Sequence, residues 1–407
     1  MATIKKDKYD INIIAAELEK IKTVKDGKAS FSAFLSEDYI TVLQTSLIFE
    51  DDIPEVEKRS LVVNGVFECA KKQVISLRGL LKYINIAEQN FRRKAFEEYD
   101  ALTSISLKYL PVITNIRLNE NVITFHRNTP TKYSLEEIKD RLFITANKPV
   151  PSAYTRVVIS CKGRTYSEAI NSAFESFDYL RGIWNFLINR LTSRRLGGER
   201  NPVNQILLGP IHTLHKKDGK LATTNFWYES FFDGKTKIYD IEKNYGYIKK
   251  NENYIRNKIK KIKYGNDLKK AFIRYSNALD YQDHNYSLLN LWSVLEFLTA
   301  TLNDRYDTTI ARTIFLYSDR DLAKQILEHL RDVRNKIVHG TERDERASYL
   351  VFQLKGFVEE LLLFHIRNKL NFNSINEASQ FLDLSYNKET IKNKIRLLKN
   401  AIKFREH

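Results

Sequence analysis

The spacing of apolar residues along the chain predicts helices in its first quarter and a change to strands after about residue 104. Between residues 60 and 102 apolar positions recur at helical intervals, and glycine is confined to Gly65 and Gly79. This spacing predicts one or two long helices. The acidic stretch just before it, residues 50–57, is interrupted by Pro54 and is interpreted as a solvated loop.

Residues 104–127 show the alternation expected of strands, with an Asn-Glu-Asn turn at 119–121. They predict an antiparallel hairpin. Residues 155–163 predict another strand, and residues 166–189 predict an amphipathic helix, because apolar residues recur there every three or four positions. Residues 194–240 hold the densest turn signals of the chain and predict a loop or hairpin excursion.

From residue 251 onward the pattern is helical, with only three glycines and no proline. The expected fold class is therefore mainly α with an α+β N-terminal region. The main domain boundary is predicted between residues 250 and 251, with a further boundary near residue 150. Residues 1–250 would select a substrate or sense a trigger, and residues 251–407 would form a helical domain.

Composition narrows the protein class. The chain has 407 residues, of which 43% are hydrophobic, with 14 Gly and 7 Pro, so a globular and mainly helical protein is expected. Cys69 and Cys161 lie far apart, which predicts neither a disulfide framework nor a cysteine zinc site. No apolar run reaches membrane-spanning length, and the first residues lack a signal-peptide core, so a cytoplasmic protein without a membrane segment is expected.

Charge points to a polyanionic partner, because 66 Lys and Arg stand against 50 Asp and Glu. Residues 248–270 are strongly basic with interleaved tyrosines, and we expect RNA contacts there from Lys258, Lys260, Lys261 and Lys263. A solvated helix or a membrane-surface helix is the alternative, although no strong apolar face accompanies the charges. The last residues, 387–407, predict a docking helix with a basic outer face and an apolar face formed by Ile391, Ile395, Leu398 and Ile402.

The most specific signal is the hexapeptide at residues 334–339, Arg-Asn-Lys-Ile-Val-His. Apolar residues from Leu322 to Val338 predict a packed helix, and Gly340 is expected to stop it, so this motif would occupy the last turns. Asn335 and His339 would share one face, and Arg334, about 100° from Asn335, could still reach the same cleft. A cation, an imidazole and an amide would then converge.

These residue types suit cleavage of an RNA phosphodiester. A histidine can act as general acid or base near neutral pH, an arginine can offset the charge of the pentacovalent phosphorane, and an amide can orient either group. This chemistry requires neither a metal nor another cofactor. The alternative for His339 is a cation at a helix C-terminus, and for Arg334 a solvated ion pair with a carboxylate such as Asp332 or Glu328.

Glu296 lies within an otherwise apolar helix, so it needs a partner, and Arg334 or Arg331 is the expected one. It would either orient the motif or form a structural ion pair. Lys336, inside the motif, is a further candidate for RNA contact.

The motif and the preceding helix at residues 283–300, with Trp292 and Glu296, resemble the HEPN superfamily in its Apea-like branch. The resemblance covers roughly residues 265–370. It implies a four-helix bundle that forms a homodimer, with Arg334, Asn335 and His339 of both copies in one composite site. It also implies metal-independent endoribonuclease activity on RNA such as tRNA, leaving 2′,3′-cyclic phosphate and 5′-hydroxyl ends.

The biological role implied by the resemblance is that of a toxin or an anti-phage abortive-infection effector, controlled by an inhibitory or activating partner protein. A non-catalytic HEPN module that binds nucleic acid or a partner remains the alternative. A membrane-surface protein is a weaker hypothesis, because a second anchoring signal is lacking. His212 and His215 form a His-x-x-His pair without a third ligand and are interpreted as hairpin surface, so no metal site is predicted.

Overall fold

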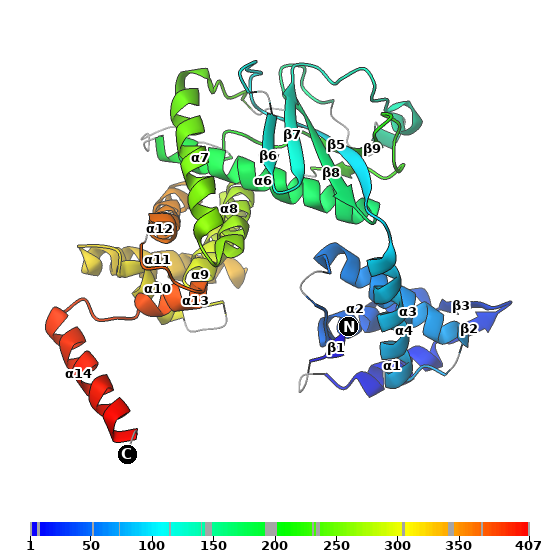
Figure 1. The fold of residues 1–407 in the computed structure, drawn as a ribbon, viewed down its shortest axis with the longest axis horizontal. Helices are drawn as coiled ribbons and strands as arrows, with labels where there is room; N and C mark the ends of the chain where they lie inside the picture. Colours follow the sequence, from blue (N-terminus) through cyan, green and yellow to red (C-terminus); the bar gives the residue numbers. More distant parts are fainter. Residues whose placement is uncertain are drawn as a thin grey trace.

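The chain is mainly helical with one six-stranded sheet (Figure 1). The computed structural model describes residues 2–5, 9–50, 53–72, 74–113, 115–139, 141–142, 149–191, 202–229, 232, 237–302, 306–340, 346–367 and 369–405. The predicted fold class, mainly α with strands in the N-terminal region, is confirmed at that level.

The first 94 residues form a helical unit with its own apolar core. Its helices and short strands are β1 (Thr3–Ile4), α1 (Ile11–Lys20), β2 (Lys22–Lys25), β3 (Lys28–Phe31), α2 (Ala33–Ser46), β4 (Leu47–Ile48), α3 (Glu55–Lys72) and α4 (Leu77–Arg93). α3 and α4 cross closely at Gly65, where a Cβ atom would lie 2.7 Å from the Cα of Ile84. The predicted loop at residues 50–57 is wrong for its second half, because α3 begins at Glu55 and Glu57 is buried.

The sheet follows directly. In spatial order it contains β10 (Trp227–Tyr228), β9 (Ile211–Lys216), β5 (Glu97–Ile105), β8 (Thr155–Gly163), β7 (Asn121–His126) and β6 (Asn115–Leu118), and each neighbouring pair is antiparallel. The predicted hairpin is confirmed as β6–β7, and Asn119 in its turn has a positive φ of 53°. The helical spacing predicts a helix as far as residue 102, whereas β5 already begins at Glu97.

α6 (Tyr166–Leu191) begins three residues after β8 and covers one face of the sheet (Figure 1). This helix is buried on all sides in its C-terminal half, because its other face packs against the C-terminal helices. At Gly182 a Cβ atom would lie 2.5 Å from the carbonyl oxygen of Phe272, a residue of α8 (Gly265–Asp280), so α6 and α8 approach closely there. α6 therefore joins the sheet to the helical region in one core.

The C-terminal region contains eight α-helices among the described residues. They are α7 (Tyr245–Lys261), α8 (Gly265–Asp280), α9 (His284–Leu298), α10 (Tyr306–Ile314), α11 (Arg320–Val338), α12 (Ala347–Arg367), α13 (Ile375–Phe381) and α14 (Lys388–Arg405). A short 3₁₀ turn at Glu242–Asn244 precedes α7, and another at Glu136–Ile138 lies between β7 and β8. α9 is central, since it packs against α8, α11 and α12. Its Trp292 is fully buried.

The apolar cores divide at a different place from the predicted domain boundaries. One cluster extends from Ala2 to Phe91, and a second extends from Tyr99 to Leu382 without a break at residue 250. Position 250 lies inside α7, whose Ile248 and Ile255 are both buried in the second cluster. Position 150 precedes β8, which pairs with both β5 and β7 in the same sheet.

A buried polar network ties α6 to α8 and to the segment 203–207. The Arg181 guanidinium, 1% exposed, donates to Asp178 at 2.9 Å and to Asp280 at 2.6 Å. Asn185 accepts from the backbone N–H of Ile206 and donates to its carbonyl oxygen. A buried charge is tolerated only when it is paired in this way, so the network fixes how these elements pack.

α14 contrasts with every other long helix, because none of its residues is buried. It extends away from the rest of the chain towards the C-terminus (Figure 1). Among the described residues, no helix is both long enough and apolar enough to cross a membrane.

Candidate functional site at the C-terminal end of α11

α11 places the motif on its last turns. Asp319 caps the helix by accepting from the backbone N–H of Leu322 at 3.1 Å, and Leu327 and Leu330 are among the residues that anchor it in the core. The His339 N–H still bonds to the Asn335 carbonyl oxygen at 3.0 Å. The predictions that the motif ends this helix and that Gly340 stops it are confirmed.

Gly340 has a φ of +70°, the left-handed conformation typical of a residue that follows a helix, and its N–H bonds to the Ile337 carbonyl oxygen at 3.1 Å. The prediction that the apolar residues of α11 are packed against neighbouring helices is wrong at both ends of the helix. Leu322 and Val338 are exposed, at 58% and 50%, because the core contacts of the helix lie between them.

Arg334 and Asn335 are in direct contact. The Arg334 Nη1 donates to Asn335 Oδ1 at 3.0 Å, and both side chains are partly buried. The carboxylates that had been expected to pair with Arg334 have other partners, since Asp332 lies near Arg331 and Glu328 lies near Lys324. The amide therefore contributes to holding the guanidinium in place.

Glu296 approaches the motif from α9. It is half-buried and accepts a hydrogen bond from Trp292 Nε1 at 2.9 Å. Burial raises the pKa of Glu296 above its ordinary value, while the Trp292 hydrogen bond and the positive charge of Arg334 lower it by less. Arg331, the other expected partner, instead donates to Asp307 at 3.0 Å. The Arg334 guanidinium is thus close enough to the Glu296 carboxyl group for its positive charge to act on it.

His339 is exposed at the end of the helix. Among the described residues its imidazole has no hydrogen bond or ion pair. The ring is therefore accessible to a substrate or to another protein surface.

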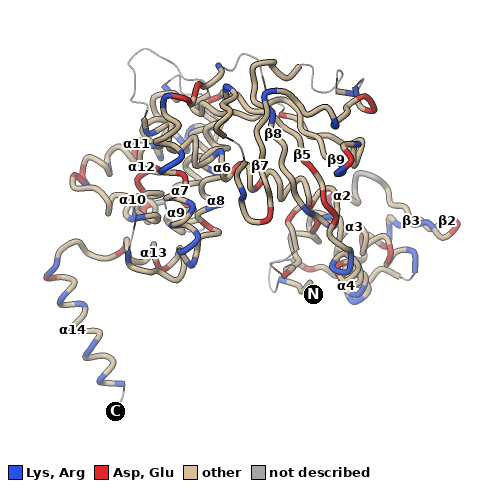
Figure 2. Tube along the Cα trace, turned by 45° about the horizontal axis from the view of Figure 1, so that its top comes forward, with Lys and Arg blue, Asp and Glu red and all other residues tan. Residues whose placement is uncertain are grey.

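The predicted RNA-binding lysines lie on two different helices. Lys258 stands over the Tyr254 ring at 5.7 Å, Lys260 and Lys261 are exposed, and Lys263 Nζ donates to Asn373 Oδ1 at 2.6 Å. All four belong to α7 or to the turn after it, and α7 packs against α6, α8 and α12. Lys336 is exposed on α11, which packs against α9, α10 and α12. Figure 2 shows how often basic residues recur along the helical region.

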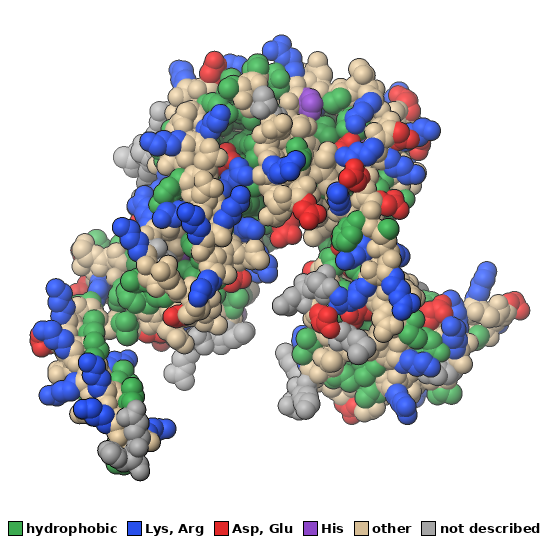
Figure 3. Space-filling model, in the orientation of Figure 1, with side chains coloured by type: hydrophobic (Ala, Val, Ile, Leu, Met, Phe, Trp, Pro, Cys, Tyr) green, Lys and Arg blue, Asp and Glu red, His purple; other side chains and the backbone are tan. Residues whose placement is uncertain are grey.

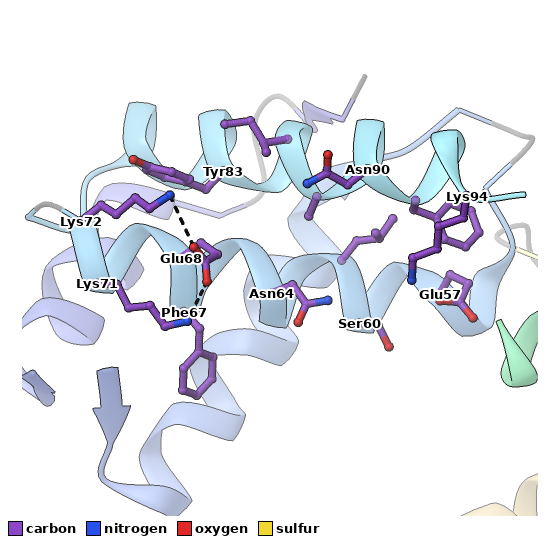
Figure 4. A pocket seen from close by; sticks show the side chains of 14 residues that line it. Glu57, Ser60, Asn64, Phe67, Glu68, Lys71, Lys72, Tyr83, Asn90 and Lys94 are labelled. Atoms are coloured by element: carbon purple, nitrogen blue, oxygen red, sulfur yellow. Dashed lines mark hydrogen bonds and ion pairs between the residues drawn. The ribbon is translucent and has the colours of Figure 1, made fainter. Parts of the chain in front are cut away.

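A second candidate site, not found from the sequence, is a groove of about 410 Å³ between α3 and α4 (Figure 4). Its wall carries the exposed side chains of Asn64, Asn90 and Lys94. At one end, Glu68 lies 2.6 Å from Lys71 Nζ and 3.6 Å from Lys72 Nζ. No local pattern marks these residues, because the groove forms only where two helices meet.

His212 and His215 are not hairpin surface, because both are buried. They lie three residues apart on β9, so their side chains point to opposite faces of the sheet. His212 packs against Phe174 of α6, whereas His215 packs against Tyr133. The described residues contain no group of three or more His, Cys, Asp or Glu side chains arranged to hold a metal ion.

Comparisons of the chain with known protein families, with curated proteins and with solved structures give no match. Its function is therefore inferred from the residues at the end of α11 and from their neighbours on α9.

Proposed function

We propose that the chain is a metal-independent endoribonuclease of the HEPN type, acting through a composite site in a homodimer. The observation that carries this proposal is the contact of Arg334 with Asn335, beside Glu296, on the same helix end that exposes His339. The packing of α9 against α8, α11 and α12 supports the proposed bundle.

In the proposed reaction the ribose 2′-hydroxyl attacks the adjacent phosphorus atom and the bond to the 5′-oxygen breaks. One product then carries a 2′,3′-cyclic phosphate and the other a 5′-hydroxyl. His339 would transfer a proton to or from one of these oxygens, and Arg334 would offset the negative charge of the phosphorane. The nucleophile is part of the RNA itself, so a metal-activated water is not needed.

The geometry of α11 favours two copies over one. His339 follows Arg334 by five positions, which places the two residues about 140° apart around a helix. Arg334 is partly buried on the side towards Glu296, whereas His339 is exposed. A histidine from one copy facing an arginine from the other would bring both groups to one phosphate. The exposed lysines Lys260, Lys261 and Lys336 would position the RNA through its phosphates.

The decisive experiment compares the wild-type protein with His339→Ala and Arg334→Ala on total tRNA and on a long single-stranded RNA, in EDTA, with the fragment ends mapped. His329→Ala and Arg331→Ala are matched controls, because they remove the same residue types from the same helix outside the motif. We expect each motif variant to lose about 100-fold or more in rate and the controls to retain activity. Equal cleavage by wild type and His339→Ala would refute the proposed catalytic role.

One observation favours a second function, a non-catalytic binding module. The His339 imidazole lacks an orienting hydrogen bond within the described part of the chain, whereas catalytic histidines are commonly oriented by one. RNA binding without cleavage, unchanged in His339→Ala, would support this module. The proposed toxin role predicts that expression of the wild type, but not of His339→Ala, arrests growth of a bacterial host.

A further inference from the structure

α14 is an amphipathic helix with an uncovered apolar side. Ile395, Leu398 and Ile402 are 47%, 55% and 59% exposed, and Ile391 is partly exposed on the same side. Figure 3 shows green and blue side chains along this helix with no other element over it. Exposed apolar residues in a continuous row, unlike scattered ones, mark an interaction surface.

The row has the spacing of a coiled-coil seam. Ile391, Ile395, Leu398 and Ile402 follow one another at intervals of four, three and four residues, so they occupy positions d, a, d and a of a heptad. Around the helix these four residues cover about 60°, whereas Leu397 and Phe404, 63% and 84% exposed, lie on an adjoining side at positions c of the heptad. The alternation of four and three residues is the spacing of a helix that packs along a single partner helix, so the seam favours that occupant.

The charges beside the seam define the chemistry of that partner. The flanking e and g positions are Lys392 and Lys399 on one side and Lys394 and Ala401 on the other. If two copies of α14 paired with each other, lysines would face lysines in either orientation, which opposes self-association. Glutamate or aspartate at the flanking positions of a different helix would instead attract these lysines.

The base of α14 is held firmly to the rest of the chain. Arg312 of α10 donates to both carboxylate oxygens of Asp383 at 2.8 Å, and the Arg320 guanidinium lies 3.6 Å from the centre of the Tyr386 ring. Asn387 Oδ1 then accepts from the backbone N–H of Glu389 at 2.9 Å and starts the helix. The seam is thus presented on an anchored helix.

We propose that α14 is a docking helix that forms a two-stranded coiled coil with an acidic amphipathic helix of a partner protein. The pairing buries the seam of isoleucines and leucine and sets partner carboxylates against Lys392, Lys394 and Lys399. This inference does not depend on the proposed nuclease activity.

The test uses the full chain and two synthetic three-heptad peptides with Ile at a and Leu at d, one with Glu and the other with Lys at e and g. Binding is measured by fluorescence anisotropy at low and high NaCl. We expect the Glu peptide to bind at least about tenfold more tightly than the Lys peptide, and the difference to shrink in high salt. Equal binding of the two peptides, or no binding of either, would overturn the proposal.

Neighbouring leucines provide a matched pair of variants. Leu398 belongs to the seam, whereas Leu397 is 63% exposed on another side of the same helix. Leu398→Asn should weaken binding of the Glu peptide about tenfold or more, and Leu397→Asn should leave it unchanged. An equal loss of binding in both variants would mean that the seam is not the docking surface. A wild-type dimer that dissociates in Leu398→Asn would make a second copy of the chain the occupant. Binding through α14 to phosphatidylserine vesicles in preference to the Glu peptide would make a membrane the occupant. Each of these results would overturn the proposal.

Discussion

Buried His365 should make the larger core sensitive to mild acid. Its ring is fully enclosed on α12, where Nε2 lies 2.9 Å from the Leu298 carbonyl oxygen and Nδ1 lies 3.1 Å from the Tyr264 hydroxyl. A neutral ring satisfies both contacts, with Nε2–H as donor and Nδ1 as acceptor. Burial lowers the pKa of His365 from 6.5 to about 4, and the Leu298 hydrogen bond opposes this by less.

The direction in which stability changes with pH follows from which state of the chain binds the proton. Between pH 6.5 and pH 4 the unfolded chain binds a proton at this residue and the folded chain does not, so acid favours unfolding. With the two pKa values above, stability falls by about 2 kcal/mol from pH 8 to pH 5 and by about 3 kcal/mol at pH 4. Above pH 7 the effect vanishes.

Urea unfolding followed by tryptophan fluorescence is a suitable assay. All three tryptophans, Trp184, Trp227 and Trp292, belong to or pack against the larger core, so the signal omits the first helical unit. Wild type and His365→Gln are compared at each pH, with His329→Gln as the exposed control. Subtracting the His365→Gln values from the wild-type values cancels the titration of other groups, including Asp280. Burial raises the pKa of Asp280 to about 6, so its titration lowers stability as the pH rises, opposite to His365. A wild-type minus His365→Gln difference that stays constant from pH 8 to pH 5 would refute the reasoning.

Other substitutions test separate parts of the structure. Gly65→Ala should destabilise the first helical unit by about 1–3 kcal/mol, seen as a lower midpoint by circular dichroism with the tryptophan transition unchanged, because a Cβ atom collides with Ile84. Arg181→Met should cost the larger core about 3–5 kcal/mol in urea unfolding, since two carboxylates lose their partner. Gly340→Ala should cost about 1 kcal/mol through its positive φ alone, because a Cβ atom would meet nothing within 4 Å. If Glu296 positions Arg334, Glu296→Gln should slow cleavage at unchanged KM and leave the free energy of unfolding at pH 7 unchanged or raised. If Glu296 instead forms a structural ion pair, the same substitution should lower that free energy.

Local signals were sufficient where the backbone depends on neighbouring residues. The turn between β6 and β7, the course of α6 and the end of α11 at Gly340 all follow from short-range spacing and a few special residues. The start of β5 was misassigned for the opposite reason. Its apolar residues also fit a helical interval, and the pairing of its nine residues with β8, fifty or more positions later in the chain, decides the outcome.

Long-range packing also explains what the sequence did not reveal about the candidate site. Glu296 could be identified as a buried carboxyl, but its two candidate arginines could be separated only when the structure paired Arg331 with Asp307. Burial of His215 depends on Tyr133, a residue that precedes it by more than eighty positions. The continuous core arises because α6 packs against both the sheet and α8, and no change of composition marks that relation.

The two proposals place different functions at opposite ends of α11. Arg320, at its first turn, contacts the base of α14, whereas the motif ends the helix at His339, about 28 Å further along its axis. Because α14 extends away from this helix (Figure 1), a peptide bound to its seam need not cover the motif. Leu398→Asn should therefore weaken docking about tenfold or more and preserve RNA cleavage, whereas His339→Ala should preserve docking and lose cleavage. If Leu398→Asn also removed cleavage, pairing through α14 would be part of the catalytic assembly, and the separation of the two ends would be wrong.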